Sequence, residues 1–309
     1  MPRWSPLPAW LRRSRWLAAA LVVMACGARS QLGVPISTDA DAGDDASEHD
    51  ALPPIDAFLE APAPYDCVEA GITYIYVITA QNELYSFYPP SLAFTKIGDI
   101  QCPGDPSAQP YSMAVSRSGV AYSVFTDGNL FRIDTASAAC QATSYVAPAQ
   151  TEPFYNMGMG FAGDLFSETL YVADAHFNAN SQGLATIDTT TFARTFVANF
   201  QPELPRCELT GTGDGRLFAF CLNLTGSGSQ IAEIDRKTAK VVGVNQLVLG
   251  DPNDAFAYAF WGGYFWIFTA PASGMSTVTR YDPQTHVEQN MASLGGEIVG
   301  AGVSTCAPQ

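Results

Sequence analysis

The chain has 309 residues, of which 15 are basic and 30 are acidic, and its formal net charge at pH 7 is −15. This charge disfavours nucleic acids and anionic lipid surfaces as partners. The hydrophobic fraction of 47% is ample for a domain-sized core.

The first 25 residues have the pattern of a secretory signal peptide. Four arginines precede an apolar run, 17–25, that is too short to span a bilayer. Cleavage after Ala25 removes these arginines and no acidic residue. The mature chain then has 11 basic and 30 acidic residues, which corresponds to a net charge of −19.

The residues around the predicted cleavage site, "VVMACG", resemble the lipobox of bacterial lipoproteins. This resemblance implies cleavage before Cys26 and acylation of its thiol and its amine, with palmitate as a typical fatty acid. Gly27 follows the acylated position, and in the Gram-negative sorting rule a residue other than Asp there implies the outer membrane. The alternative is an ordinary signal peptide that leaves Cys26 as a free thiol.

Residues 26–66 are predicted to form an acidic, disordered linker. The stretch "STDADAGDDASEHDALPPIDAFLEAPAPYD" is rich in Asp, Ala and Pro, and no Lys or Arg occurs between Arg29 and Lys96. Such a segment cannot bury enough apolar surface to fold. The piece "DADAGDD" lacks the full spacing and the terminal Glu of a calcium loop. We therefore favour a solvated linker over a Ca²⁺ site.

A phrase typified by "LATIDTTT" occurs five times, with starts 46, 54, 47 and 47 residues apart. The copies span 84–91, 130–137, 184–191, 231–238 and 278–285. Four copies have Asp at the fifth position, namely Asp134, Asp188, Asp235 and Asp282, whereas the first copy has Tyr88. An alternating run that stops at Asp-x-x-Ser/Thr predicts a strand entering a turn, with the carboxylate accepting backbone N–H groups. We interpret these aspartates as turn residues and not as catalytic groups.

Small residues recur at a second set of equivalent positions, each within an apolar run: Ala114, Gly158, Gly211, Ala259 and Gly300. An aromatic run follows each of the first four, as in "GRLFAFC" and "GYFWIFT". Four short strands in each unit of about 47 residues, without an amphipathic helix, are typical of β-propeller blades. The sequence thus predicts an all-β, five-bladed β-propeller with four-stranded antiparallel blades.

The two ends of the repeat region complete each other. The first unit has three strands and lacks an inner one, while "GEIVGAGVS" near the C-terminus is an inner strand without the other three. The C-terminal inner strand is therefore expected to join the N-terminal blade and close the ring. Over residues 67–306 the pattern resembles propellers of the YVTN and gluconolactonase-like types, and the Trp-Asp dipeptide of WD repeats is absent.

Six cysteines besides Cys26 suggest three disulfides in an exported chain. A hairpin centred on Asp214 places Cys207 opposite Cys221. Cys67 precedes the first strand and Cys306 follows the last, so their bond would fasten the ring. Cys102–Cys140 follows by elimination. No spacing suggests a zinc site.

The axial mouth of the ring, where loops enter the inner strands, is the expected ligand site. Three positions before each small residue the sequence has Tyr111, Tyr155, Glu208, Phe256 and Glu297. These aromatic and carboxylate groups could stack a sugar ring or hold a cation, or could simply be core. The gluconolactonase-like resemblance implies a divalent metal held by Glu, Asn and Asp. The positions that match loosely are Glu297, Asn156, Glu208 and Asp254.

Other motifs are weaker. "DAHFNANSQG" carries Asp174, His176, Asn178 and Asn180 in a long insertion that reads as a ligand loop or a polar crossover. "NLTGSGS", 223–229, is typical of a hairpin tip. The three histidines, at 49, 176 and 286, are too scattered to suggest a His-based catalytic triad.

These patterns predict a signal peptide (1–25), a lipidated linker (26–66) and a propeller domain (67–309). We expect an outer-membrane lipoprotein that is anchored only through its lipid and whose ring binds an envelope protein or a glycan. No cofactor is expected, although Ca²⁺ is considered. The alternative is a metal-dependent lactonase- or hydrolase-like enzyme with its site on the axis.

Overall fold

The computed structural model describes residues 73–309, apart from 165, 176–180, 223–227, 250–254 and 272–273. The predicted signal peptide, the acylated Cys26, the linker and Cys67 lie outside the described residues. Within the described residues, no helix has the length and hydrophobicity that a bilayer span requires.

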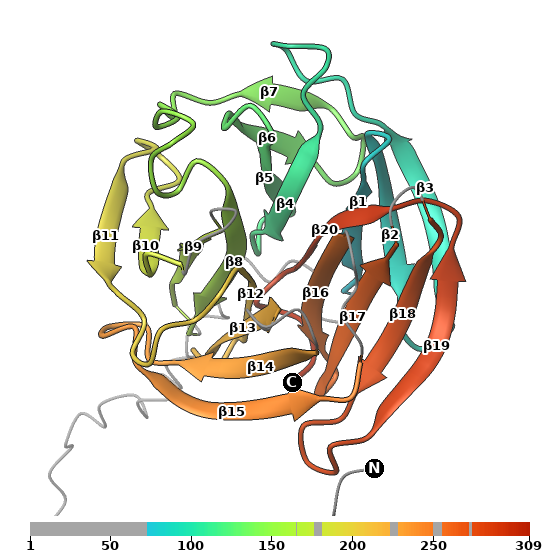
Figure 1. Ribbon diagram of the computed structural model, residues 1–309. Helices are drawn as coiled ribbons and strands as arrows, with labels where there is room; N and C mark the ends of the chain where they lie inside the picture. The colour runs from blue at the N-terminus through green and yellow to red at the C-terminus, as the bar shows by residue number, and fades with distance from the viewer. Residues whose placement is uncertain (1–72, 165, 176–180, 223–227, 250–254, 272–273) are drawn as a thin grey trace, which may run out of the picture. The chain divides into compact units, whose positions relative to one another are not determined.

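The described chain forms five four-stranded antiparallel sheets arranged as the blades of a ring (Figure 1), which confirms the predicted five-bladed β-propeller. From the inner to the outer strand, blade 1 consists of β20 (Ile298–Val303), β1 (Ile75–Thr79), β2 (Glu83–Tyr88) and β3 (Ala93–Asp99). Blade 2 consists of β4 (Pro110–Val115), β5 (Val120–Phe125), β6 (Leu130–Asp134) and β7 (Cys140–Ala142).

The other three blades follow in chain order. Blade 3 consists of β8 (Met157–Gly163), β9 (Glu168–Asp174), β10 (Leu184–Ile187) and β11 (Arg194–Ala198). Blade 4 consists of β12 (Cys207–Gly211), β13 (Leu217–Leu222), β14 (Ser229–Ile234) and β15 (Val241–Leu247). Blade 5 consists of β16 (Ala255–Trp261), β17 (Tyr264–Ala270), β18 (Ser276–Tyr281) and β19 (Glu288–Leu294).

The ring closes in blade 1, as the sequence predicts. β20 pairs with β1 in antiparallel register, with Val77 opposite Ala301. β20 also packs against the inner strands of both neighbouring blades, β4 and β16. The first copy of the repeated phrase, which has Tyr88 in place of Asp, lies in this blade. There, the ring of Tyr88 packs against Tyr74 and against Trp261 of blade 5.

Small residues on the inner strands allow neighbouring backbones to come close together. A Cβ atom on Gly158 of β8 would lie 2.0 Å from the carbonyl oxygen of Cys207 on β12. A Cβ atom on Gly302 of β20 would lie 2.7 Å from the amide nitrogen of Val115 on β4. Contacts this short exclude any larger residue unless the strands move apart.

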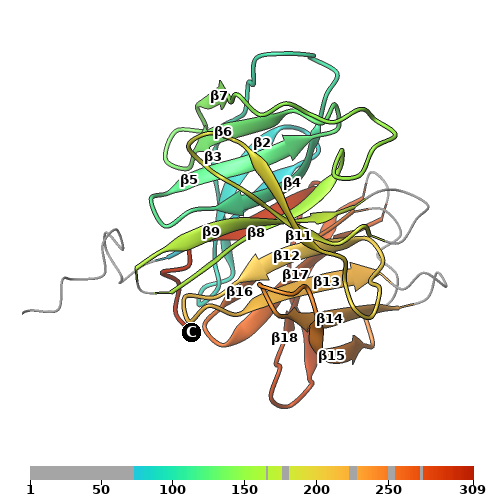
Figure 2. The same ribbon diagram turned by 90° about the vertical axis from the view of Figure 1, so that its left-hand side faces the viewer.

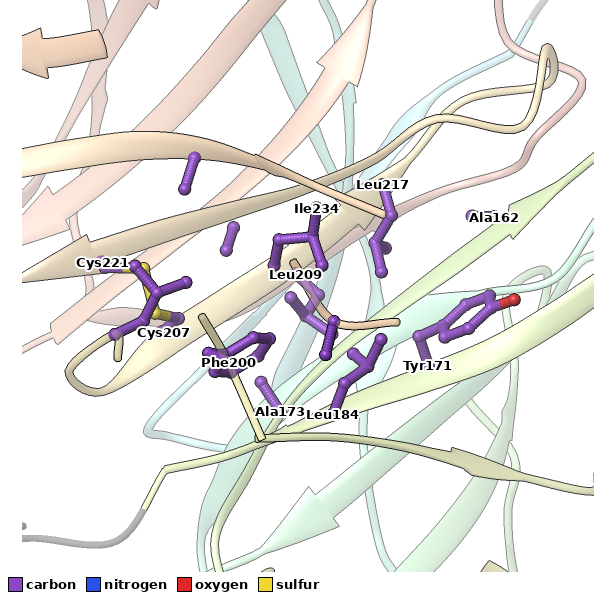
Figure 3. Close-up of a cluster of buried hydrophobic side chains, with 14 residues drawn as sticks. Ala162, Tyr171, Ala173, Leu184, Phe200, Cys207, Leu209, Leu217, Cys221 and Ile234 are labelled. Atoms are coloured by element: carbon purple, nitrogen blue, oxygen red, sulfur yellow. A yellow bond between two sulfur atoms is a disulfide. The ribbon is translucent and has the colours of Figure 1, made fainter. Parts of the chain in front are cut away.

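The hydrophobic core is divided into clusters between neighbouring blades. Figure 3 shows the cluster between blades 3 and 4, where Leu184 and Tyr171 face Leu209 and Leu217. The disulfide Cys207–Cys221 lies in the same cluster, and the two residues are directly paired across β12 and β13. Cys102 and Cys140 are also bonded to each other. Both of these pairings confirm the sequence prediction.

The third predicted disulfide is described at one end only. Cys306 is disulfide-bonded, and its predicted partner Cys67 lies outside the described residues. The Cys67–Cys306 pairing therefore stays a prediction.

The four repeated aspartates are turn residues, as predicted. Oδ1 of Asp188, for example, accepts the backbone N–H groups of Thr190 and Thr191 at 2.9 and 2.7 Å. The same pattern holds at Asp134, Asp235 and Asp282. Hydrogen bonds from the Ser or Thr hydroxyl of the turn, which are the main cause at Asp134 and Asp235, and from the backbone amides, which are the main cause at Asp188 and Asp282, lower the pKa of all four carboxyl groups. The turn ends at a residue with positive φ in all five copies: Leu92, Ala138, Phe192, Ala239 and His286.

Candidate functional site

A cavity of about 410 Å³ opens at the end of the ring where the inner strands begin. Strands β4, β12, β16 and β20 bring their first residues to it, so it occupies the axial mouth that the sequence predicts. The lining consists of Ala80, Gln109, Pro110, Tyr111, Thr126, Arg206, Glu208, Ala255, Phe256, Glu297 and Val299. We call this space the axial cavity.

One wall of the axial cavity is formed by a cation and two aromatic rings. The guanidinium carbon of Arg206 lies 4.9 Å from the ring centre of Phe256, in the geometry of a cation–π contact. The hydroxyl of Tyr111 donates a hydrogen bond to the carbonyl oxygen of Ala175 at 3.3 Å. Burial raises the pKa of Tyr111, and the nearby Arg206 partly opposes this shift. The wall therefore presents apolar faces together with fixed hydrogen-bond donors.

Glu208 is the buried carboxyl group of the axial cavity, and only 5% of it is exposed. The hydroxyl of Ser112 on β4 donates a hydrogen bond to Glu208 Oε2 at 2.5 Å. Ser112 is held in turn by the amide of Met159, which donates to its Oγ at 3.1 Å. Burial raises the pKa of Glu208 to about 8, although the Ser112 hydrogen bond acts in the opposite direction. At neutral pH Glu208 is therefore mostly a carboxylic acid that can donate a hydrogen bond.

The structure brings four of the predicted residues together: Tyr111, Glu208, Phe256 and Glu297 all line the axial cavity. Tyr155 does not line it and lies against Gly128 of blade 2. Asn156 is also outside the lining; its carbonyl oxygen accepts the amide of Ala175, and its Oδ1 is buried without a partner among the described atoms.

The loop before β8 explains where Tyr155 lies. Phe154 adopts a left-handed conformation with φ of 64°, which is uncommon for a bulky residue. Its amide donates to Oδ1 of the buried Asp174 at 2.8 Å, and this bond holds the turn. The sequence prediction assumes that the chain enters the inner strand with the same backbone conformation in every blade. In blade 3 the chain turns at Phe154 instead.

Arg206 is the functional side chain that the sequence prediction missed. It precedes Glu208 by two residues and so has the same alternation on the strand, but it lies just outside the apolar run of β12. The alternation of side chains along the strand could therefore have predicted that Arg206 faces the same side as Glu208. Gln109 and Thr126 were also missed because they lie in turns that the repeat does not define.

The residues implied for a metal site are only partly assembled. Glu208 and Glu297 line the axial cavity, Asn156 does not, and Asp254 lies outside the described residues. Among the described residues, no group of three or more His, Cys, Asp or Glu side chains is placed to hold a metal ion. The described part of the implied ligand set therefore does not fit a metal centre.

The opposite end of the axis is covered by the C-terminal segment, residues 304–309. A Cβ atom on Gly213 of blade 4 would lie 2.3 Å from the carbonyl oxygen of Thr305, and Gly262 of blade 5 donates its amide to Pro308 at 2.8 Å. In Figure 2, which views the ring from the side, the C-terminus lies at this end. We call this the closed end.

A buried polar network fastens the C-terminal segment to blades 2 and 3. The Arg117 amide donates to Glu168 Oε1 at 2.9 Å, and the Arg117 guanidinium donates to the Thr305 hydroxyl at 2.9 Å. Thr305 donates in turn to Glu168 Oε2 at 2.9 Å. The Arg117 and Glu168 side chains are only 8% and 14% exposed. Burial raises the pKa of Glu168 despite these contacts.

The remaining motifs have structural roles where they are described. The buried Asp174 accepts the amides of Phe154 and Gln182, whereas His176, Asn178 and Asn180 lie outside the described residues. Most of the predicted hairpin tip at 223–229 is outside them as well. His286 takes the positive-φ position of its turn and hydrogen-bonds the Tyr281 hydroxyl through Nδ1 at 2.8 Å.

No protein-family profile matches the chain, and no curated protein matches it either. Among solved structures, the chain is similar to TolB from Acinetobacter baumannii, with 12% identity over 71% of the chain and a TM-score of 0.41. It is also similar to an oligogalacturonate lyase in complex with manganese, with 10% identity over 69% of the chain and a TM-score of 0.34.

The chain spans 52% of that TolB chain and 59% of that lyase chain, less than two thirds of each. At these identities and TM-scores, the likenesses carry no information on function. The resemblance to YVTN and gluconolactonase-like propellers stays a prediction.

Proposed function

We propose that this protein is a non-enzymatic binding module of the cell envelope and that its axial cavity holds a sugar residue of an envelope glycan. The observation that carries the proposal is the composition of the cavity wall. Phe256 and Tyr111 supply apolar ring faces, and the Arg206 guanidinium is fixed 4.9 Å from the centre of the Phe256 ring. Aromatic faces combined with a few fixed polar groups are typical of small-ligand sites.

The polar groups of the cavity suit a ligand that carries several hydroxyl groups. Arg206 and a protonated Glu208 can donate hydrogen bonds, and Glu297 can accept them. Gln109 and Thr126 at the rim of the cavity can both donate and accept hydrogen bonds. A sugar ring matches this mixture because its faces are apolar and its edge carries alternating donors and acceptors.

The envelope location rests on the sequence pattern. A basic region, a short apolar run and the lipobox-like residues before Cys26 support export and lipid anchoring. The acidic linker that follows would separate the ring from the lipid surface. Gly27 supports the outer membrane as the destination.

Binding can be tested by screening the full chain in detergent against an array of neutral and acidic oligosaccharides, followed by calorimetry with the sugars retained. We expect Phe256→Leu to weaken binding by about tenfold or more, because the ring face is lost while the apolar volume is largely kept. Phe166→Ala is the matched control, since Phe166 is 75% exposed and does not line the cavity. The proposal would be contradicted if the chain bound envelope proteins but no sugar. An affinity for the sugar that is unchanged in Phe256→Leu would contradict it as well.

The anchor requires a separate experiment. Cys26→Ser should move the protein from the membrane fraction to the soluble envelope fraction and abolish incorporation of labelled palmitate. A protein that stays in the membrane fraction after this substitution would rule out anchoring through Cys26.

A metal-dependent hydrolase is the second candidate, because Glu208 and Glu297 share one cavity. Calorimetric titration of Ca²⁺ and Zn²⁺ separates the two proposals. Micromolar binding that is lost in Glu297→Ala would favour the enzyme, and an absence of binding would favour the binding module.

A further inference from the structure

Two adjoining cavities lie on blade 3, away from the axial cavity. The first, of about 420 Å³, is lined mainly by the loop 148–154 and by β11. The second, of about 480 Å³, is lined by residues 181–182 and 199–203. Both cavities are lined by Gln182 and Asn199, so they adjoin each other, and we treat them together as one groove. We call it the rim groove.

Phe196 is an exposed aromatic ring within the rim groove. It lies on the outer strand β11, pairs with Ala185 and is 53% exposed. The residues at the equivalent paired position of the other outer strands are Lys96, Ala142, Val244 and Asn290. No other blade therefore has an aromatic residue at this position. The repeat does not require an aromatic ring at this position, and the ring presents an accessible apolar surface within the groove.

The support beneath Phe196 is rigid. The buried ring of Phe154 meets it edge to face, with 6.3 Å between ring centres, and the Arg194 guanidinium lies 4.9 Å from the centre of the Phe154 ring. Phe154 is held in its left-handed conformation by the hydrogen bond to Asp174. Asp174 Oδ2 also accepts the amide of Gln182 at 2.8 Å. One buried carboxylate thus fixes both sides of the groove, and backbone strain held in this way is typical of ligand clamps.

The polar side chains of the rim groove are mostly amides. Gln182, Asn199 and Gln201 are all exposed, and the first two line both cavities. An amide offers a donor and an acceptor side by side, which matches two adjacent hydroxyl groups. The charged side chains are Glu152, Arg194 and Glu203, so the groove has no excess of positive charge that would select an anionic polymer.

From this arrangement we infer that the rim groove is a second ligand site, which takes a linear, neutral oligosaccharide with one sugar ring stacked on Phe196. The two cavities are contiguous, which suits several linked units better than one. The groove opens on the same end of the ring as the axial cavity, because both are lined by residues that precede inner strands. The two sites are linked indirectly: Tyr111 of the axial cavity donates to Ala175, and the preceding Asp174 accepts the amides of Phe154 and Gln182, which line the groove.

The inference is tested by calorimetry of the full chain in detergent with β-1,4-linked oligomers of glucose and of N-acetylglucosamine, from the monomer to the hexamer. We expect affinity to rise by about tenfold or more with chain length and this gain to disappear in Phe196→Ala. Phe166→Ala, which changes a more exposed ring elsewhere, should keep the gain. Asn199→Ala is the second variant, in case Phe196→Ala lowers the unfolding temperature.

The two sites can fail independently. If the proposed axial function is also correct, Phe256→Leu should reduce the affinity for monomers while the gain with chain length stays. One outcome would support the rim groove and contradict the axial site. In it, neither the parent nor any variant binds monomers, but the parent binds longer oligomers and this binding depends on Phe196. Oligomer binding that Phe196→Ala and Asn199→Ala leave within about twofold of the parent would overturn the inference. Binding of a proline-rich peptide in place of every oligomer would overturn it as well.

Discussion

The two ends of the propeller axis are built in opposite ways. At the closed end, Arg117, Glu168 and Thr305 exchange buried hydrogen bonds, and Gly213 lets the C-terminal segment approach its backbone. At the other end, Arg206, Phe256 and Glu208 surround an open cavity. The repeat supplies the same five inner strands to both ends. The difference therefore lies in the residues at the ends of the strands and in the segments between them, which stabilise the ring at one end and leave room for a ligand at the other.

The largest effect is expected at the closed end. Arg117→Ala removes one partner of a buried ion pair and leaves Glu168 only the hydrogen bonds from Thr305 and from the backbone amide of residue 117, so the free energy of unfolding should fall by about 3 kcal/mol. Urea unfolding measures this loss. Arg132→Ala, at an exposed position, should change stability by less than about 0.5 kcal/mol. Equal losses in the two variants would show that the network does not fasten the ring.

A second prediction concerns pH at the open end. Burial raises the pKa of Glu208 from 4.5 to about 8, so between these values the folded state holds a proton that the unfolded state has lost. The contribution of Glu208 to stability should thus be fully present below pH 4.5 and decrease by about 1.4 kcal/mol per pH unit as the pH rises toward 8. The neighbouring Tyr111 and Tyr258 have pKa values raised by burial and keep their protons in this range.

Denaturant unfolding at several pH values tests this slope. Glu208→Gln cannot ionise and should flatten it, whereas Glu168→Gln at the closed end should leave the Glu208 contribution in place. An unchanged slope in Glu208→Gln would show that the carboxyl group is ionised in the folded protein.

A smaller loss is expected in the hairpin turns that surround the closed end. Asp188→Ala removes the acceptor of two backbone N–H groups, and the free energy of unfolding should fall by about 1 kcal/mol. The neighbouring Thr189→Ala is the control. Thermal unfolding of both variants shows whether the repeated aspartate, and not the turn as a whole, is responsible.

The smallest stability effect should come from the wall of the axial cavity. Tyr111→Phe removes the partly buried hydrogen bond to Ala175 and the hydrogen bond between the Tyr111 hydroxyl and Arg206, and should cost about 0.5 kcal/mol of unfolding free energy. If this end is a binding site, the same variant should lose more affinity for its sugar than stability. A loss confined to stability would place Tyr111 in the core.

Features that follow from periodicity could be predicted from the sequence. The strand order, the closure through β20, the Cys207–Cys221 register and the turn role of Asp188 all depend on residues that recur at fixed spacing. Spacing determines which residues face each other across a ladder, so these features did not require knowledge of any distant contact.

The network at the closed end could not be predicted in this way. Thr305 lies 188 residues from Arg117 and 137 from Glu168, and none of the three belongs to a repeated column. The position of Tyr155 was missed for a local reason, because the left-handed Phe154 changes the direction of the chain just before β8. Four of the eleven lining residues of the axial cavity were found because they alternate on the inner strands or just before them. Gln109, Thr126 and Arg206 lie outside the strands, in segments whose conformation the repeat leaves open.

The blade shared between the two ends of the chain has a consequence for biosynthesis. Because β1 pairs with β20, the first strand of the ring has no inner neighbour until residues 298–303 have been made. Completion of the ring is thereby deferred until β20 has left the ribosome. A nascent chain interrupted before Ile298 would lack the strand that both β4 and β16 contact. Quality-control proteases would then encounter an open ring.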